Sequence, residues 1–290
     1  LPLPGGRRFI LIEEVVRAVL PELYQGAEVL EAHLFRVTRS ANISVDEDAP
    51  DRLEAVQEKL LRRMLGSVVR LEVEAAMPPW MREQLLQDLQ FSSREAVSVL
   101  SEADVYAVDR LVDLFALEEI AELPIEELHY PPFDRNAALD RDRSVWEQVA
   151  EGDRLLRFPY DSFESGVERL LAAAAVDDDV VSIRITLYRT SRASHVVDLL
   201  RQARRQGKEV VALIELTASF DEQRNIEWAR MLESTGIHVI FGPPRLKVHA
   251  KVLLIVRHEG EQLRRYAYVG TGNLNAATAA AYTDLGLLTA

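Results

Sequence analysis

The chain has 290 residues, of which 48% are hydrophobic and 28% are charged, a composition typical of soluble globular domains rather than of a disordered or fibrous chain. It contains no cysteine, which excludes disulfides, thiolate metal sites and a cysteine nucleophile. Its formal net charge of -13 argues against a general nucleic-acid-binding surface, although a local basic cluster can still bind an anion.

The apolar runs are too short to cross a bilayer, and the N-terminal LPLPGGRRF lacks the charged-then-apolar order of a signal peptide. We therefore expect a cytoplasmic protein with no membrane insertion and no nucleic-acid partner. The absence of an initial methionine and the apolar run TDLGLLTA at the other end indicate a piece of a longer protein.

Residues 1–131 are predicted to form an α+β domain, because strand-like and helix-like segments follow one another without a regular βαβ rhythm. The pattern predicts strands at residues 29–43 and 68–80, and helices at residues 48–66, 82–91 and 110–123. The polar, proline-bearing stretch that begins at His129 marks the boundary of this domain.

Residues 132–290 are predicted to form an α/β domain with a mixed, largely parallel sheet, because apolar strands that alternate with helices usually pair in parallel. Ser162 is expected to cap the first helix, while Gly207 and Gly236 are expected to end the next two. The strands are expected at residues 180–189, 209–216 and 237–242, followed by a hairpin of 247–257 with 264–270. The terminal run 283–290 is expected to be a strand left open, in a domain truncated at its C-terminus.

The stretch LKVHAKVLLI, at residues 246–255, combines an apolar strand pattern with His249 and Lys251. Since side chains alternate along a strand, these two are expected to lie on the same face. A neutral imidazole can attack phosphorus, and a neighbouring ammonium can neutralise developing phosphate charge. The pair is therefore a candidate core for phosphoryl transfer.

The next strand ends in Gly270, Thr271, Gly272 and Asn273. Two glycines at a strand end allow backbone N–H groups to approach an anion, and the asparagine adds a side-chain donor. We expect this loop and the strand that carries His249 to frame one phosphate. Taken separately, however, a histidine on a strand is more often structural, and GTGN is more often an ordinary turn.

The order of these motifs resembles the half-site pattern of the phospholipase D superfamily, H-x-K followed by G-[ST]-G-N, with Val256 where an aspartate is usual. The runs PYDSFESGVERLLAAAA, ITLYR, IELTASFDEQRNIEWARMLESTGIHVIFG, LKVHAK and YVGTGNLNAATAAAYTDLGLLTA more closely resemble the first catalytic domain of long-chain polyphosphate kinases. FRVTRSANISVDED and VVRLEVEAAMP resemble that family's middle, or head, domain.

The resemblance implies reversible transfer of the terminal phosphate of ATP to polyphosphate through a phosphohistidine at His249, with Lys251 as charge partner. It implies that Arg189 lies at a magnesium- and phosphate-binding position and that Tyr282 contacts the nucleotide. Ser219 stands where the family has a second active-site arginine, so a charged phosphate contact is lost unless Arg184, Arg192 or Arg224 replaces it. The implied cofactor is Mg²⁺, the implied partners are ATP, ADP and polyphosphate, and the full-length protein is expected to be a homo-oligomer.

The family completes its site with a second phospholipase D-like half and an N-terminal domain, so this stretch alone is expected to hold the nucleophile but not the whole pocket. Two alternatives stay open. The same histidine would serve a phosphodiesterase of the phospholipase D type, in which water takes the phosphoryl group. A degenerate chain that binds polyphosphate without turnover would account for Ser219.

Overall fold

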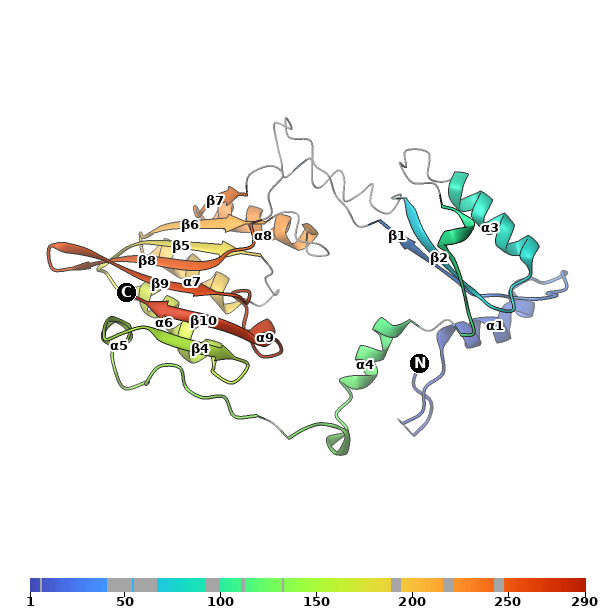
Figure 1. Cartoon of the computed structure of the whole chain (residues 1–290), viewed down its shortest axis with the longest axis horizontal. Coiled ribbons are helices and arrows are strands. Elements are labelled where there is room, and N and C mark those ends of the chain that lie inside the picture. Colours follow the sequence, from blue (N-terminus) through green and yellow to red (C-terminus); the bar gives the residue numbers. More distant parts are fainter. Residues whose placement is uncertain are drawn as a thin grey trace. The chain divides into compact units, whose positions relative to one another are not determined.

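The computed structural model describes residues 1–5, 7–40, 54, 67–91, 100–110, 113–131, 133–188, 194–215, 222–242 and 248–290. These residues belong to two compact units: the first takes in the described residues of 1–41 and 62–129, and the second takes in residue 54 and the described residues from 130 onward. Figure 1 shows the elements of each unit, and the two units are described separately below.

The first unit is built on a three-stranded sheet in the order β1-β2-β3. Strand β1 (Phe35–Arg39) is antiparallel to β2 (Val68–Glu74), which is parallel to β3 (Val105–Val108). Its helices are α1 (Ile12–Leu23), α3 (Pro79–Phe91) and the short α4 (Leu117–Ala121). Apolar residues of β2 and α3 form a small core with their neighbours: Val68, Leu71, Val73, Met77, Leu86 and Leu100.

Three sequence predictions for this unit differ from the structure. The strand expected at 68–80 ends at Glu74, and its last two residues, Pro79 and Trp80, begin α3. The strand expected at 29–43 is only five residues long, Phe35–Arg39. The helix expected at 110–123 is a 3₁₀ turn, Leu114–Ala116, followed by the five residues of α4. The helix pattern has no buried face to stabilise it, since neither the 3₁₀ turn nor α4 has a buried residue. The helix expected at 48–66 lies outside the described residues.

The second unit is built on a seven-stranded sheet in the order β4-β10-β9-β8-β5-β6-β7. Its strands are β4 (Arg154–Phe158), β5 (Val180–Leu187), β6 (Glu209–Ile214), β7 (His238–Phe241), β8 (Lys251–Glu259), β9 (Gln262–Gly270) and β10 (Asp284–Thr289). Its helices are α5 (Val145–Ala150), α6 (Arg169–Val176), α7 (His195–Arg205), α8 (Glu222–Ser234) and α9 (Ala276–Ala279).

The sheet is mixed, but the expectation that it is largely parallel was wrong. Parallel pairing among the described strands of this sheet is confined to β5 with β6 and β6 with β7, where α7 and α8 make the crossovers. The pairs β5–β8, β8–β9, β9–β10 and β10–β4 are antiparallel. Strand β10 is not left open, because it lies between β4 and β9 and both of its edges are paired.

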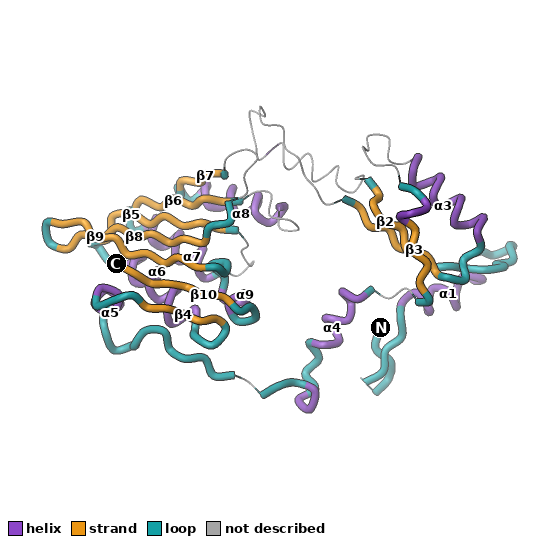
Figure 2. Tube along the Cα trace, in the orientation of Figure 1, coloured by secondary structure: helices purple, strands orange, loops and turns teal. Residues whose placement is uncertain are grey.

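One face of this sheet carries the core of the unit. Figure 2 shows α6 and α7 behind the strands, and buried residues from these helices and from α5 and α8 join those of the strands in one apolar cluster. The inward residues follow the two-residue alternation of the strands, as with Ile183 and Ile185 in β5 and Leu253 and Ile255 in β8, all at most 3% exposed. This core fixes the register of the strand ends where the predicted site lies.

The helix expected after Ser162 is confirmed with a modified start. The hydroxyl of Ser162 accepts a hydrogen bond from the N–H of Ser165 at 3.0 Å. A five-residue π turn, Glu164–Glu168, then leads into α6. Gly207 and Gly236 follow α7 and α8 with φ of +84° and +80°, the left-handed conformation that glycine adopts most readily at a helix end.

Candidate active site

His249 lies in the loop that enters β8, with its side chain exposed. The strand begins only at Lys251, so the expectation that both residues occupy one face of a strand was wrong for His249. The side chain of a loop residue does not follow the alternation of a strand, so the direction of the His249 side chain depends on the contacts of the loop. Those contacts come from Lys251, from the end of β5 and from the end of β6.

Lys251 points into the protein and is only 4% exposed. Its ammonium donates a hydrogen bond to the carbonyl oxygen of His249 at 2.6 Å, and its Nζ lies 4.9 Å from the ring centre of Tyr188. None of the carboxylates in the described residues forms an ion pair with it. Burial lowers the pKa of Lys251, and the charge of Asp284 opposes that shift only in part. The site thus contains a partly desolvated cation next to the backbone of its histidine.

Tyr188, the residue after β5, contacts both members of the pair. Its ring meets that of His249 edge to face, with ring centres 5.3 Å apart and an interplanar angle of 81°. Sequence reasoning missed this residue, because its neighbours come from another strand and only the β5–β8 register brings them together. The sequence feature that could have pointed to Tyr188 is its place at the end of a predicted apolar strand.

The arginine positions of the site are less fully described. Arg189 follows Tyr188 and, like Ser219 and Arg192, lies outside the described residues. The side chain of Arg224 also lies outside them. Arg184 is described, and it lies within β5 with a side chain that is 52% exposed and 3.7 Å from a carboxylate oxygen of Glu209. It therefore has a partner at the strand surface.

The GTGN loop begins directly beside the lysine, because Gly270 is the register partner of Lys251 on one side and of Gly286 on the other. The N–H of Thr271 donates to the carbonyl of Leu285 at 2.9 Å, so that donor is used within the sheet and not held for an anion. The Thr271 hydroxyl donates to Asp284 Oδ1 at 2.7 Å.

The two glycines of the loop have steric reasons to be glycine. A Cβ at Gly270 would lie 2.3 Å from the hydroxyl of the buried Tyr268, and one at Gly272 would lie 2.5 Å from Asp284 Oδ2. Both distances are shorter than non-bonded contacts allow. The close approach expected of these glycines is therefore to side chains of the same sheet.

Asn273 and Tyr282 complete the predicted set. The Oδ1 atom of Asn273 is buried and has no hydrogen-bond partner within the described residues. Tyr282 lies in the turn after α9 and is 63% exposed. An exposed ring of this kind is free to stack on a ligand.

Asp284, the first residue of β10, is the second residue that sequence reasoning missed. It accepts the Thr271 hydrogen bond and faces Gly272, and its charge partly opposes the lowering of the Lys251 pKa by burial. Burial raises the pKa of Tyr268, and the charge of Asp284 adds to that effect. Its position next to the apolar run of β10 was the available signal.

The described residues contain no group of three or more metal-ligating side chains. Magnesium usually binds through one or two carboxylates and the phosphates of its substrate, with water filling the other positions. A magnesium ion of this kind needs no protein cage.

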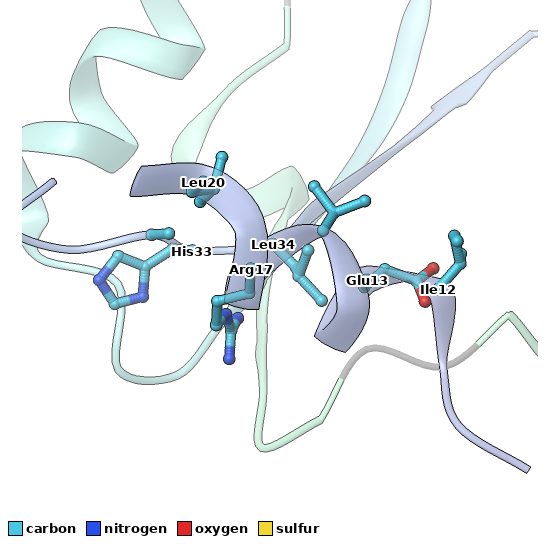
Figure 3. A pocket seen from close by; sticks show the side chains of 8 residues that line it. Ile12, Glu13, Arg17, Leu20, His33 and Leu34 are labelled. Carbon is cyan, nitrogen blue, oxygen red and sulfur yellow. The ribbon is translucent and has the colours of Figure 1, made fainter. Parts of the chain in front are cut away.

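A separate hollow of about 270 Å³ occurs in the first unit. Figure 3 shows Leu20, Arg17, Glu13 and Ile12 along α1, with His33 and Leu34 on the neighbouring segment. All of its lining residues lie between positions 12 and 34, so it includes none of the residues predicted for the phosphate site.

Comparison with known proteins identifies the family. The pattern described as "Polyphosphate kinase middle domain" matches residues 1–120, and the pattern described as "Polyphosphate kinase C-terminal domain 1" matches residues 144–290. The chain belongs to the polyphosphate kinase family. This finding agrees with the motifs around His249 and with the resemblance of FRVTRSANISVDED and VVRLEVEAAMP to the family's middle domain.

The relatives of the chain are longer proteins. A polyphosphate kinase of Mycolicibacterium gilvum is 44% identical over 99% of this chain and 39% of its own length, and one of Streptomyces coelicolor is 44% identical over 99% and 38%. The crystal structure of polyphosphate kinase from Porphyromonas gingivalis is 28% identical, covers 96% of this chain and 38% of its own, and superposes with a TM-score of 0.67. The chain thus spans about two fifths of the curated relatives it matches.

The helices in the described part of the chain are all too short or too polar to cross a membrane.

Proposed function

We propose that this chain carries the nucleophile of a polyphosphate kinase, with His249 receiving the terminal phosphate of ATP and passing it to polyphosphate. The observation that supports this most is the exposed imidazole of His249, whose backbone carbonyl binds the buried ammonium of Lys251. An exposed ring can meet a phosphate, while the cation below it offsets the charge of the transferring group.

The reaction has two balanced steps. The unprotonated ring nitrogen of His249 forms an N–P bond as the bond between the terminal phosphorus of ATP and its bridging oxygen breaks, and ADP leaves with that electron pair. A terminal oxygen of polyphosphate then attacks the same phosphorus, and the N–P bond breaks to restore the imidazole. Because a phosphohistidine is high in energy, the reverse transfer to ADP is also open.

The remaining site residues belong to the same proposal. Arg189 and the GTGN loop would contact phosphate groups, and Tyr282 would contact the nucleotide. Magnesium bound with the nucleotide would screen phosphate charge. Ser219 would leave one phosphate contact weaker than in other family members. Division into domains at residues 1–131 and 132–290, a cytoplasmic location and homo-oligomerisation are further parts of the proposal.

The test is labelling of the full-length protein by ATP that carries a labelled terminal phosphate, in the presence of magnesium. We expect an acid-labile, base-stable label on the native protein and none on His249→Ala, with Ser219→Arg labelled at least as fast as the native protein. Label only in Ser219→Arg would favour a decayed site that binds polyphosphate. Hydrolysis of a phosphodiester without ATP or metal would favour the phosphodiesterase alternative.

A further inference from the structure

The backbone just before the nucleophile is held by a carboxylate from another strand. Glu215 follows β6, is only 5% exposed, and accepts a hydrogen bond through Oε2 from the N–H of Val248 at 2.7 Å. Val248 is the residue directly before His249. A carboxylate from the end of β6 therefore fixes the chain one residue away from the imidazole.

The side chain of Val248 fixes the same segment from a second direction. A Cβ at Gly242, just after β7, would lie 2.5 Å from Cγ2 of Val248 and 3.6 Å from Oε2 of Glu215. The absence of a side chain at Gly242 thus leaves the space that Val248 fills. Val248 is therefore held both by a hydrogen bond and by packing.

Asn225 on α8 joins the ends of the neighbouring strands β5 and β6. It is 2% exposed, and its side-chain amide donates to the carbonyl of Tyr188 at 3.0 Å and to the carbonyl of Glu215 at 2.8 Å. The N–H of Glu215 also donates to the carbonyl of Leu187 at 3.2 Å. Tyr188, whose ring contacts His249, and Glu215, which binds Val248, are therefore held in one frame.

We propose that Glu215 is a positioning residue for His249, and that Asn225 supports it by joining the ends of β5 and β6. The inference rests on the proposed function, because it assigns a role within the same transfer site. Glu215 binds the backbone before His249, and so acts through the nucleophile. Without this contact the imidazole would lose its fixed distance to the phosphate and its edge contact with Tyr188.

The size of the effect follows from the sensitivity of group transfer to geometry. A displacement of about 1 Å in a reacting group can cost on the order of 100-fold in rate. We expect Glu215→Gln, which weakens a charge-assisted hydrogen bond, to slow phosphorylation of His249 by on the order of 10- to 100-fold at saturating ATP, with an unchanged KM for ATP. Glu215→Asp keeps the charge but is one methylene shorter. We expect it too to slow phosphorylation of His249 while leaving the KM for ATP unchanged.

The test uses the full-length protein and two measurements. The first is the rate of labelling of His249 by ATP. The second is the NMR signal of the His249 imidazole, which carries a ring-current shift from Tyr188. This signal is assigned by its loss in His249→Ala, and its measurement needs no turnover. The matched control is Glu168→Gln, since Glu168 is a buried carboxylate of the same unit that binds His195 at 3.0 Å and, among the described residues, has no hydrogen bond to Val248 or His249.

The outcomes separate the two proposals. Slower labelling with a displaced His249 signal in either Glu215 variant, and neither change in Glu168→Gln, would support the positioning role. Native labelling and a native signal in both Glu215 variants would overturn it, as would equal slowing in Glu168→Gln. If the native protein takes no label but Glu215→Gln still displaces the His249 signal, the proposed function fails while the positioning of His249 stands.

Discussion

Strand β8 carries a cation near each end, and the two differ in their surroundings. Arg257 is held by Asp177 at 2.9 Å and Asp179 at 3.1 Å, and its guanidinium lies 5.3 Å from the ring centre of Trp146. Lys251, at the other end, has a backbone carbonyl and a tyrosine ring as its neighbours. The difference separates a guanidinium that is paired with carboxylates from a buried ammonium that forms no ion pair within the described residues.

The titration of the two groups follows the same division. Burial lowers the pKa of both, but the hydrogen bond and charge of Asp177 reverse the effect at Arg257, so that its pKa is raised. At Lys251 burial prevails and the pKa is lowered. We therefore expect substitutions at the Lys251 end to change activity and substitutions at the Arg257 end to change stability.

The largest expected effect is at Lys251. Lys251→Met keeps the length of the side chain but removes its charge, and we expect the rate of phosphohistidine formation to fall on the order of 100- to 1000-fold, as when one electrostatic donor is removed from an active site. The midpoint of thermal unfolding should stay the same or rise, because a desolvated charge is removed. Rapid-quench labelling and calorimetry measure the two quantities, and a native labelling rate would remove Lys251 from the site.

The converse effect is expected at Arg257. Arg257→Met leaves Asp177 and Asp179 without their partner, and we expect the free energy of unfolding to fall by about 1–3 kcal/mol, between the values for exposed and buried ion pairs. Denaturant unfolding measures this, with Arg265→Met on the exposed side of β9 as control. Labelling at 25 °C should be native; a selective loss of labelling with native stability would contradict the structural role of this end.

The pH dependence of labelling sharpens the same contrast. Because the pKa of Lys251 is lowered from its ordinary value of 10.5, its charge is present below the lowered pKa and is lost as pH rises through it. We expect labelling to decline on the alkaline side at a lower pH than an exposed lysine would give. Lys251→Arg should move this decline upward, because a guanidinium stays charged. A decline at the same pH in both proteins would assign it to another group.

The smallest effect is expected at Tyr266, which donates a hydrogen bond to Glu259 near the Arg257 end. Burial and this bond raise the pKa of Tyr266 to about 12, so its hydroxyl remains a donor throughout the neutral range. Tyr266→Phe should lower the free energy of unfolding by about 1 kcal/mol, since Glu259 keeps its contact with Arg264 at 3.3 Å. Urea unfolding is the measurement, and an altered labelling rate is not expected.

Much of the second unit could be predicted from its periodicity. The helix and strand pattern from residue 162 to 242 and the β8–β9 hairpin were confirmed, because each segment has apolar residues at the spacing that its own packing requires. Strand β4 was missed, since RLLRF is short and begins and ends near arginines. The place of β10 inside the sheet depends on pairing with residues more than a hundred positions away, which local pattern does not encode.

The site was predictable only in its motif-bearing part. Residue type and spacing were enough to identify His249, Lys251 and the GTGN loop. The register of Lys251 with Gly270 brings two of these elements together. Tyr188, Glu215, Asn225 and Asp284 were not singled out, because their roles arise from contacts between the ends of different strands. The loop position of His249 was also hidden, since VHAKV continues the strand pattern without a break.

The most direct measurement is to locate the phosphate itself. The full-length protein would be incubated briefly with ATP and magnesium, digested at alkaline pH to preserve phosphoramidates, and mapped by mass spectrometry. We predict phosphate on His249 and on none of His195, His238 or His258 of this region. Phosphate on one of those histidines, with an unmodified His249 peptide, would contradict the assignment of the nucleophile.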